Sequence, residues 1–398
     1  MMREFIVTVY LTIVKILSSI YVLFPIQNKV TFVMSYGENH FFIYEEMNRQ
    51  NIDCEIIFLY KSTCKYNLSE FSHVKRYKFE SLNLIHMVKA IYHLSTSKYI
   101  IVDNYFGTLS AIYLKEGVQC IQLWHAAGAI KKFGLLAPSF KQRSLRSQRR
   151  FLKVYDAFHK VVVGSDSLAT IYKRAFGLSD DRILRTGIPR TDLFFNEKSK
   201  ERIKKEIVSK NLKLGDKKII LYAPTFRNEN MGNFGFCLDV ENMYRALKDE
   251  YVLIVRLHPA IRNKLKYNEK YRGFLYDYSS YPNVNELFLI TDILITDYSS
   301  IPFEFCLLGK QMIFFAYDLS DYVQKNGIIG NYISNIPGPI VYNTDEIISE
   351  IKSGTLEINK INTFANEWNQ YSRGNASKNF VNAIFKDNAF RSVKNEKG

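Results

Sequence analysis

The sequence lacks the cysteine and histidine spacings that hold a structural or catalytic metal. Its five cysteines form no CxxC pair and no zinc pattern, and its seven histidines include no HExxH or other close ligand spacing. We therefore expect reduced, mostly buried cysteines in a cytosolic chain, with no protein-bound metal and no other cofactor.

The common phosphate-binding loops are missing as well. There is no GxxxxGKS or GxxxxGKT segment, which excludes a P-loop, and no GxGxxG opens a helix. Low-complexity tracts and short repeats are also absent.

Positive charge, by contrast, is in excess. Lys and Arg number 54 against 39 Asp and Glu, a formal net charge of +15. Such an excess suits a nucleic acid, a phospholipid surface or a phosphorylated substrate. Nucleic acid is disfavoured because no known binding module is present. With 398 residues, 47% of them hydrophobic, the chain is long enough for two globular domains, each with its own core.

One long apolar run, residues 5–24, could just span a bilayer. A lysine at mid-bilayer costs about 2.5–3.5 kcal/mol, and no small-residue cleavage site follows the run. Its polar residues share one helical stripe: Thr8, Thr12, Lys15 and Ser19. This pattern favours an interfacial membrane helix over residues 1–27. A buried amphipathic helix and a true span or signal are the alternatives.

After this run, strand-like and helix-like segments alternate, which predicts two parallel, doubly wound sheets. Residues 81–94 and 105–116 are helical in pattern, and a charged helical segment near 190–215 separates the two series of strands. The expected domains are 28–200 and 201–398. The expected strands are residues 30–35, 54–60, 99–103, 118–124 and 160–165, then 217–224, 251–259, 287–296 and 311–317.

Polar side chains end four of these strands, where ligands of parallel sheets bind. They are His125, Lys131 and Lys132 after 118–124, Arg227 after 217–224, Arg256 and His258 in 251–259, and Asp297, Ser299 and Ser300 after 287–296. A helix starting near Pro302 would offer backbone N–H groups and its dipole to a phosphate. The set suits phosphoryl transfer.

Each residue also has a structural explanation when taken alone. Ser299 and Ser300 can be a simple helix cap, and a His-Pro pair after a strand is usually structural. The basic segment 141–153 can be a solvated helix face or a patch that meets lipid phosphates or a pyrophosphate. The coincidence of four strand ends favours the functional interpretation.

Five ordered motifs resemble one family, the CDP-glycerol glycerophosphotransferases of wall teichoic acid synthesis, over roughly residues 20–380. The motifs are LWHAAGAIKKFG (123–134), GIPRTD (187–192), YAPTFR (222–227), RLHP (256–259) and ITDYSSIPFEF (295–305). The form of the first, with the short length, is most like that of the glycerol-phosphate primases. The family's polymerases more often have Trp-His-Gly-Thr-Pro there and carry extra segments.

The resemblance implies a GT-B-like fold of two Rossmann-like domains, with the donor on the C-terminal one. It implies transfer of glycerol phosphate from CDP-glycerol to the N-acetylmannosamine of an undecaprenyl-diphosphate-linked disaccharide, with release of CMP. The enzyme would be a peripheral protein on the cytoplasmic face of the cell membrane. Both a monomer and a homo-oligomer are compatible with the resemblance.

By position in the motifs, His125 matches the family's base and His258 its second essential histidine. Arg227, Ser299 and Ser300 match donor-phosphate positions, and Glu304 a nucleotide contact. Histidine suits the role of base, since its ordinary pKa is about 6.5. Fixed donors have to meet the charge on the phosphoryl oxygens and on the departing CMP.

Three alternatives remain. A GT-B glycosyltransferase that uses a nucleotide sugar would share the fold but attack an anomeric carbon, and release of UDP instead of CMP would identify it. A teichoic acid polymerase would add a ladder of units where a primase adds one. A catalytically silent protein that binds anionic glycolipid would keep both its ligand binding and its biological activity when His125 is lost.

Overall fold

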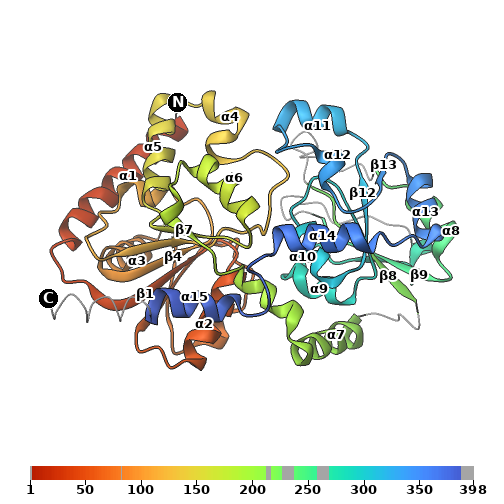
Figure 1. The fold of residues 1–398 in the computed structure, drawn as a ribbon. Coiled ribbons are helices and arrows are strands. Elements are labelled where there is room, and N and C mark those ends of the chain that lie inside the picture. The colour runs from red at the N-terminus through yellow and green to blue at the C-terminus, as the bar shows by residue number, and fades with distance from the viewer. Residues whose placement is uncertain (1, 82, 212–216, 226–236, 258–268, 387–398) are drawn as a thin grey trace. The chain divides into compact units, whose positions relative to one another are not determined.

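The computed structural model describes residues 2–81, 83–211, 217–225, 237–257 and 269–386 (Figure 1). They form two compact units, which we describe separately. Unit 1 contains residues 1–126, 133–192 and 370–398, and unit 2 contains residues 127–132 and 193–369.

Unit 1 is built on a sheet that has seven strands within the described residues. Every neighbouring pair is parallel, and the order is β3-β2-β1-β4-β5-β6-β7. The strands are β1 (Gln27–Met34), β2 (Glu55–Tyr60), β3 (Lys75–Lys78), β4 (Ser97–Val102), β5 (Gln119–Gln122), β6 (Lys160–Val162) and β7 (Ile183–Leu184). The central strand β1 is buried from Val30 to Met34, and every residue of this stretch except Thr31 is apolar. This is expected for a parallel strand covered on both faces.

The helices of unit 1 follow the local signals of the sequence. In α6, Ser165 caps the N-terminus by accepting from the Leu168 N–H, and Gly177 ends the helix in the left-handed conformation (φ 71°). The helices are α1 (Met2–Tyr21), α2 (Glu38–Arg49), α3 (Leu84–Thr96), α4 (Pro138–Lys141), α5 (Leu145–Asp156), α6 (Asp166–Phe176) and α15 (Ala376–Val381). The short turns are η1 (Leu68–Phe71), η2 (Gly107–Ala111), η3 (Gly134–Leu136), η4 (Asp180–Arg182) and the π-helical η9 (Asn382–Lys386); η5 (Pro189–Phe195) leads into unit 2.

Unit 2 repeats the same plan with a six-stranded sheet in the described part of the chain. Its order, β10-β9-β8-β11-β12-β13, again has the first strand of the unit next to the fourth, and all pairs are parallel. This is the strand order of doubly wound Rossmann-type sheets. The strands are β8 (Lys218–Tyr222), β9 (Tyr251–Val255), β10 (Leu275–Asp277), β11 (Ile293–Thr296), β12 (Gln311–Phe315) and β13 (Ile340–Val341).

The core of unit 2 lies between this sheet and two of its helices. Met243 of α8 and Ile347 of α13 pack with the strand residues Leu253 and Ile295, all of them fully buried. The helices are α7 (Glu197–Asn211), α8 (Val240–Leu247), α9 (Val284–Ile290), α10 (Pro302–Phe305), α11 (Leu319–Asn326), α12 (Tyr332–Asn335), α13 (Thr344–Ser353) and α14 (Ile358–Trp368), with turns η7 (Glu269–Tyr271) and η8 (Cys306–Leu308).

Two predicted elements are wrong. The expected strand 287–296 begins as the helix α9, and the strand itself is only Ile293–Thr296. Asn283 caps α9 through the N–H of Asn285, and an apolar run of this length does not distinguish a buried helix from a buried strand. The expected helix 105–116 contains only the turn η2. The edge strands β3, β7, β10 and β13, two to four residues long, were not predicted.

The division of the chain also differs from the expected boundaries of 28–200 and 201–398. The crossing at residues 192/193 falls close to the expected boundary, but the described residues 370–386 return to unit 1. The Asp192 carboxylate accepts from the N–H groups of Ala376 and Ser377, both at 2.8 Å, and α15 packs against α2 (Figure 1). Burial raises the pKa of Asp192.

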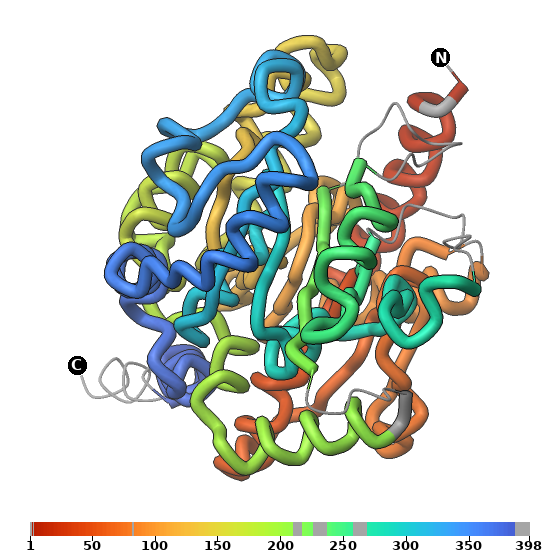
Figure 2. The backbone as a smooth tube through the Cα atoms, turned by 90° about the vertical axis from the view of Figure 1, so that its right-hand side faces the viewer, coloured from red at the N-terminus to blue at the C-terminus, as the bar shows by residue number. Residues whose placement is uncertain are grey.

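The helix α1 is one continuous helix, red in Figure 2, that packs on α3 and η2 of unit 1. Val14 and Ser18 on its inner side are fully buried. Its outer side exposes the large apolar residues Phe5, Ile6, Val9, Ile13, Ile16 and Ile20. By length and composition, α1 is the one helix of the described residues that could cross a membrane. The same features suit an interfacial helix.

Candidate functional site

In unit 1, the carboxyl ends of β1 and β4 meet where the strand order reverses, which is where ligands of such sheets bind. Asp103, the residue after β4, accepts hydrogen bonds there from three consecutive backbone N–H groups, those of Ser35, Tyr36 and Gly37, at 2.8–2.9 Å. Its carboxylate is buried, so these bonds fix the turn that follows β1.

His125 lies beside this turn, the third residue after the buried end of β5. Its Nδ1 is 3.3 Å from the carbonyl oxygen of Asp103, and its ring lies 5.0 Å from the ring of Tyr36 and stacks at 4.6 Å on Trp124. A carbonyl oxygen can only accept, so Nδ1 carries the proton in this contact. The other ring nitrogen, Nε2, is then the one that can accept a proton. The ring is half-buried.

The backbone around His125 is held in a strained shape. Trp124 has φ 56°, a left-handed conformation that costs a non-glycine residue on the order of 1–3 kcal/mol. Asn39 donates to the Trp124 carbonyl at 3.2 Å, and Arg190 donates to the His125 carbonyl at 3.1 Å. Arg190 is itself buried and paired with Glu38 at 2.9 Å. Such strain persists only where the surroundings enforce it.

In unit 2, an aspartate occupies the corresponding place. Asp297 follows β11 directly, and its buried carboxylate accepts from the N–H of Thr225, the third residue after β8, at 2.9 and 3.1 Å, and from the Thr225 hydroxyl at 2.5 Å. The carbonyl of Asp297 accepts from Tyr332 at 3.1 Å. Asp297 thus positions Thr225 of the YAPTFR motif, and its contact with substrate stays a prediction.

The hydroxyl cluster lies in the turn between β11 and α10. The helix α10 is only four residues long, and its N-cap is Ile301, which makes no side-chain capping bond. Ser299 Oγ accepts from the Ile301 N–H at 3.4 Å, and both Ser299 and Ser300 are half-buried. A helix does begin at Pro302, as predicted, but with four residues α10 has only a small dipole, so a phosphate contact here would come mainly from the serines and the turn. Glu304 is buried, with Asn285 Nδ2 3.4 Å from its carboxylate.

The remaining predicted residues are spread over unit 2. Arg256 follows β9, half-buried, with its guanidinium 3.5 Å from the Tyr281 carbonyl. Lys131 and Lys132 are exposed and run beside residues 327–328, where Lys131 pairs with Ile328 and the Lys132 N–H donates to Gly327. His258 and Arg227 lie outside the described residues.

The structure thus brings His125 to the strand-order reversal of unit 1, and Asp297 and the serines to that of unit 2. Sequence reasoning missed Asp103 and Arg190 as residues that support His125. Asp103 was the last residue of a predicted strand, and Arg190 lay within the quoted GIPRTD motif, but neither position shows which backbone groups the side chain contacts. No group of three or more metal-ligating side chains occurs among the residues described.

Gly128, in the loop after His125, has no room for a side chain. A Cβ there would come within 2.2 Å of the Phe303 ring of α10. Gly128→Ala is expected to destabilise the protein by about 1–3 kcal/mol, because the loop or the ring must shift, and to weaken donor binding through the displaced turn 299–301. Thermal unfolding and donor titration measure both effects.

Gly107→Ala is the matched control, since a Cβ there would meet nothing closer than 3.9 Å. Gly128→Ala combined with Phe303→Leu should recover part of the loss. An unchanged melting temperature in Gly128→Ala would show that this close packing does not constrain the loop.

Comparison with known proteins identifies the family. Residues 16–386 match the family described as CDP-glycerol:poly(glycerophosphate) glycerophosphotransferase. The chain is 40% identical over 360 residues to the teichoic acid glycerol-phosphate primase of Bacillus subtilis (strain 168), covering 90% of this chain and 92% of that protein. It is 34% identical to the teichoic acid poly(ribitol-phosphate) polymerase of Bacillus spizizenii, covering 91% of this chain but 57% of that protein.

Among solved structures, that of the wall teichoic acid polymerase TagF has a TM-score of 0.80 and 25% sequence identity, over 97% of this chain and 98% of that one. Both parallel α/β sheets fall within this match. The chain belongs to the CDP-glycerol glycerophosphotransferase family of teichoic acid synthesis.

Proposed function

We propose that the protein is a primase: it transfers one glycerol phosphate from CDP-glycerol to the N-acetylmannosamine of an undecaprenyl-diphosphate-linked disaccharide and releases CMP. The observation that carries this proposal is the near-complete match to a glycerol-phosphate primase, 92% of its length against 57% for the ribitol-phosphate polymerase. The geometry of His125 is compatible with the chemistry.

In the proposed reaction, an acceptor hydroxyl oxygen attacks the phosphorus that carries glycerol. The new P–O bond forms as the bond to the CMP phosphate breaks, and CMP leaves with that electron pair. The Nε2 of His125 takes the hydroxyl proton, because Nδ1 is committed to Asp103. Fixed donors stabilise the charge on the phosphoryl group.

We assign the donor to unit 2 and the acceptor to unit 1 of a GT-B enzyme. Ser299, Ser300 and the positioned Thr225 segment are the described donor-side groups, and Arg227 and His258 are the expected cationic ones. Lys131, Lys132, Arg256 and Glu304 stay candidate contacts.

The deciding experiment incubates the purified protein with CDP-glycerol and a short-chain lipid disaccharide, and weighs the product by mass spectrometry. One added glycerol phosphate together with CMP is expected. A ladder of products would indicate a polymerase, which the 34% identity to a polymerase keeps as the second candidate. Release of UDP from UDP-sugars without CMP release would refute both.

We also propose that α1 holds the protein on the inner face of the cell membrane. Ile6→Gln, Ile13→Gln and Ile16→Gln together should move it from the membrane to the soluble fraction, since each buried aliphatic side chain contributes about 1.5–3 kcal/mol. These residues face outward, so stability should stay within about 0.5 kcal/mol per substitution. Fractionation and thermal unfolding measure the two effects.

Replacing the exposed Ile333, Leu356 and Ile358 by glutamine is the matched control and should leave membrane binding intact. Deleting residues 1–24 is a poorer test, because it also removes the buried Val14 and Ser18 from unit 1. A triple variant of α1 that stays in the membrane fraction would exclude this face as the main anchor.

A further inference from the structure

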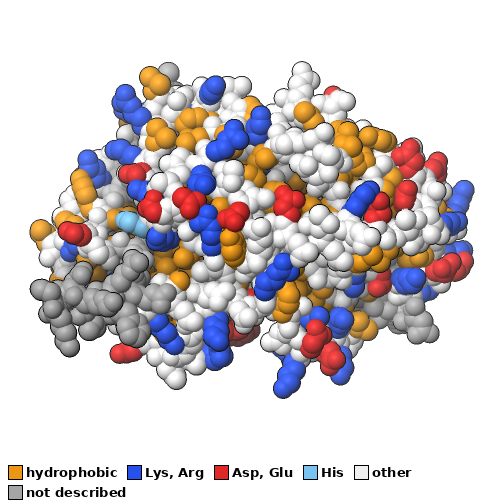
Figure 3. Space-filling model, in the orientation of Figure 1, with side chains coloured by type: hydrophobic (Ala, Val, Ile, Leu, Met, Phe, Trp, Pro, Cys, Tyr) orange, Lys and Arg blue, Asp and Glu red, His pale blue; other side chains and the backbone are white. Residues whose placement is uncertain are grey.

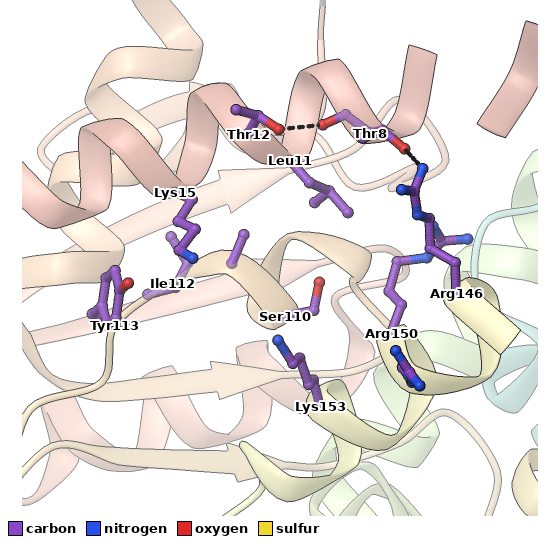
Figure 4. Close-up of a pocket in the computed structure, with 12 residues that line it drawn as sticks. Thr8, Leu11, Thr12, Lys15, Ser110, Ile112, Tyr113, Arg146, Arg150 and Lys153 are labelled. Atoms are coloured by element: carbon purple, nitrogen blue, oxygen red, sulfur yellow. Dashed lines mark hydrogen bonds between the residues drawn. The ribbon is translucent and has the colours of Figure 1, made fainter. Parts of the chain in front are cut away.

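A cavity of about 490 Å³ lies within unit 1, away from His125. Its walls are α1, the segment from η2 to Tyr113, and α5 (Figure 4). Nothing in the proposed chemistry so far uses it.

The cavity is strongly basic. Five cationic side chains line it: Lys15, Arg146, Arg149, Arg150 and Lys153. In Figure 4 the amino groups of Lys15 and Lys153 point into the same space from opposite walls. Among the described residues, one carboxylate contacts these cations, that of Glu4, 3.2 Å from Arg150. Like charges held this close repel one another, and a multiply charged anion would relieve that repulsion.

The cations of this lining are its donors for phosphate oxygens. The hydroxyls of Thr8, Thr12 and Ser110 also line the cavity, but each donates its proton to a backbone carbonyl, those of Glu4, Thr8 and Gly107 respectively. Arginine and lysine make charge-assisted hydrogen bonds to phosphate that are about twice as strong as neutral ones. Figure 3 shows Lys and Arg side chains gathered over α4 and α5, and α5 supplies four of the five cations of the cavity.

The other exposed side of α1 is apolar. At about 100° per residue, Thr8, Leu11, Thr12 and Lys15 form one stripe facing the cavity, and the exposed aliphatic residues Ile6, Ile13 and Ile16 lie between about a quarter and half a turn away. A contiguous apolar surface beside a basic cavity fits an amphiphile with an anionic head and a hydrocarbon tail.

We propose that this cavity binds the diphosphate of a lipid, with the hydrocarbon chain against the apolar side of α1. Five cations exceed what a singly charged phosphodiester requires, and the adjacent apolar face favours a lipid over a free anion. The inference rests on the proposed function, because it makes the cavity the site for the diphosphate of the lipid-linked acceptor.

The position in the chain fits this role. Asp103, which holds His125, is seven residues before Ser110 of the cavity wall, a span of at most about 25 Å. In the proposed acceptor, the disaccharide lies between the diphosphate and the reacting hydroxyl. This spacing keeps the cavity wall and the residue that holds His125 within one chain segment of the same unit.

The test titrates the full chain with farnesyl diphosphate, and compares farnesyl monophosphate, inorganic pyrophosphate and phosphatidylglycerol vesicles. Arg149→Ala combined with Lys153→Ala is expected to weaken farnesyl diphosphate by about 10- to 100-fold, because two charge-assisted contacts are lost. Both side chains are exposed, so the melting temperature should hardly change.

The matched control, Arg174→Ala with Lys198→Ala, removes one arginine and one lysine from exposed positions outside the cavity and should bind as the original does. Unchanged farnesyl diphosphate affinity in the cavity variant would overturn the proposal. So would equal affinity for the monophosphate or for inorganic pyrophosphate, or a loss confined to phosphatidylglycerol vesicles, which would make the cavity a general phospholipid site.

Kinetics separate this proposal from the proposed function. The cavity variant should raise the KM for the lipid acceptor and leave kcat and the KM for CDP-glycerol unchanged. The original protein could bind farnesyl diphosphate but transfer no glycerol phosphate, while the cavity variant binds farnesyl diphosphate more weakly. In that case the primase assignment fails and the diphosphate site stands. Full transfer with an unchanged acceptor KM in the variant refutes the site alone.

Discussion

His125→Ala should slow glycerol-phosphate transfer by roughly 10²–10⁴-fold, the contribution typical of a general base. Donor binding should be preserved, because the base acts only when the acceptor hydroxyl loses its proton. The His125 ring is half-buried, and its loss also removes its contacts with the rings of Trp124 and Tyr36, so a modest fall in melting temperature is expected. Single-turnover rates, calorimetric donor affinity and melting temperature measure the three quantities.

His73→Ala is the matched control. His73 is exposed and bonded to Tyr44 at 2.7 Å, so its loss should leave the rate unchanged. His258→Ala should differ from His125→Ala by weakening CDP-glycerol as well, because we expect His258 to contact the donor phosphate. If His125→Ala lost donor binding while His258→Ala kept it, the two roles would be reversed.

Arg190→Ala should lower the free energy of unfolding by about 3–5 kcal/mol, the cost of leaving one partner of a buried ion pair unpaired. Glu38 would lose its 2.9 Å partner, and the His125 carbonyl would lose a donor. The strained backbone at Trp124 would then be less constrained, so we expect slower transfer as well. Urea unfolding and initial rates measure these effects.

Two variants test whether the effect arises from the buried pair. Adding Glu38→Gln to Arg190→Ala removes the unpaired charge and should recover part of the stability. Arg185→Ala also removes an arginine with two ion pairs, to Asp166 and Asp180, but these lie at the surface, so it should cost at most about 1 kcal/mol. Equal losses in Arg185→Ala and Arg190→Ala would contradict our account.

Much of the fold could be predicted from the sequence because apolar strand patterns are local. All nine predicted strand regions contain a strand, although the one expected from residue 287 begins as helix α9. The edge strands were missed because strands as short as Ile183–Leu184 carry almost no pattern. The return of residues 370–386 to unit 1 was missed because it depends on distant contacts such as those of Asp192.

The chemically active residues of the candidate site could be predicted from the sequence, but the residues that hold them in place could not. His125 and Ser299 could be found because they follow strands, and the carboxyl ends of parallel strands meet at one edge. The role of Asp103 could not be found, because it depends on which turn lies beside β4 across the sheet. The basic segment 141–153 indicated only one wall of the basic cavity. The other two walls come from distant segments of the chain, so the cavity itself could not be predicted.

The return of the C-terminal segment bears on how the protein forms during synthesis. Unit 1 begins to emerge first, yet Asp192 cannot meet Ala376 until about 185 further residues have been made. At about 5–20 residues per second this takes roughly 10–40 s. Throughout that interval the surface of α2 that α15 covers is left open on the nascent chain. Unit 2 consists of residues 193–369 and six earlier residues, 127–132. It can therefore complete its fold before unit 1 does. The N-terminal unit is thus the last to be completed, and chaperones that act on ribosome-bound chains have a defined period in which to bind it.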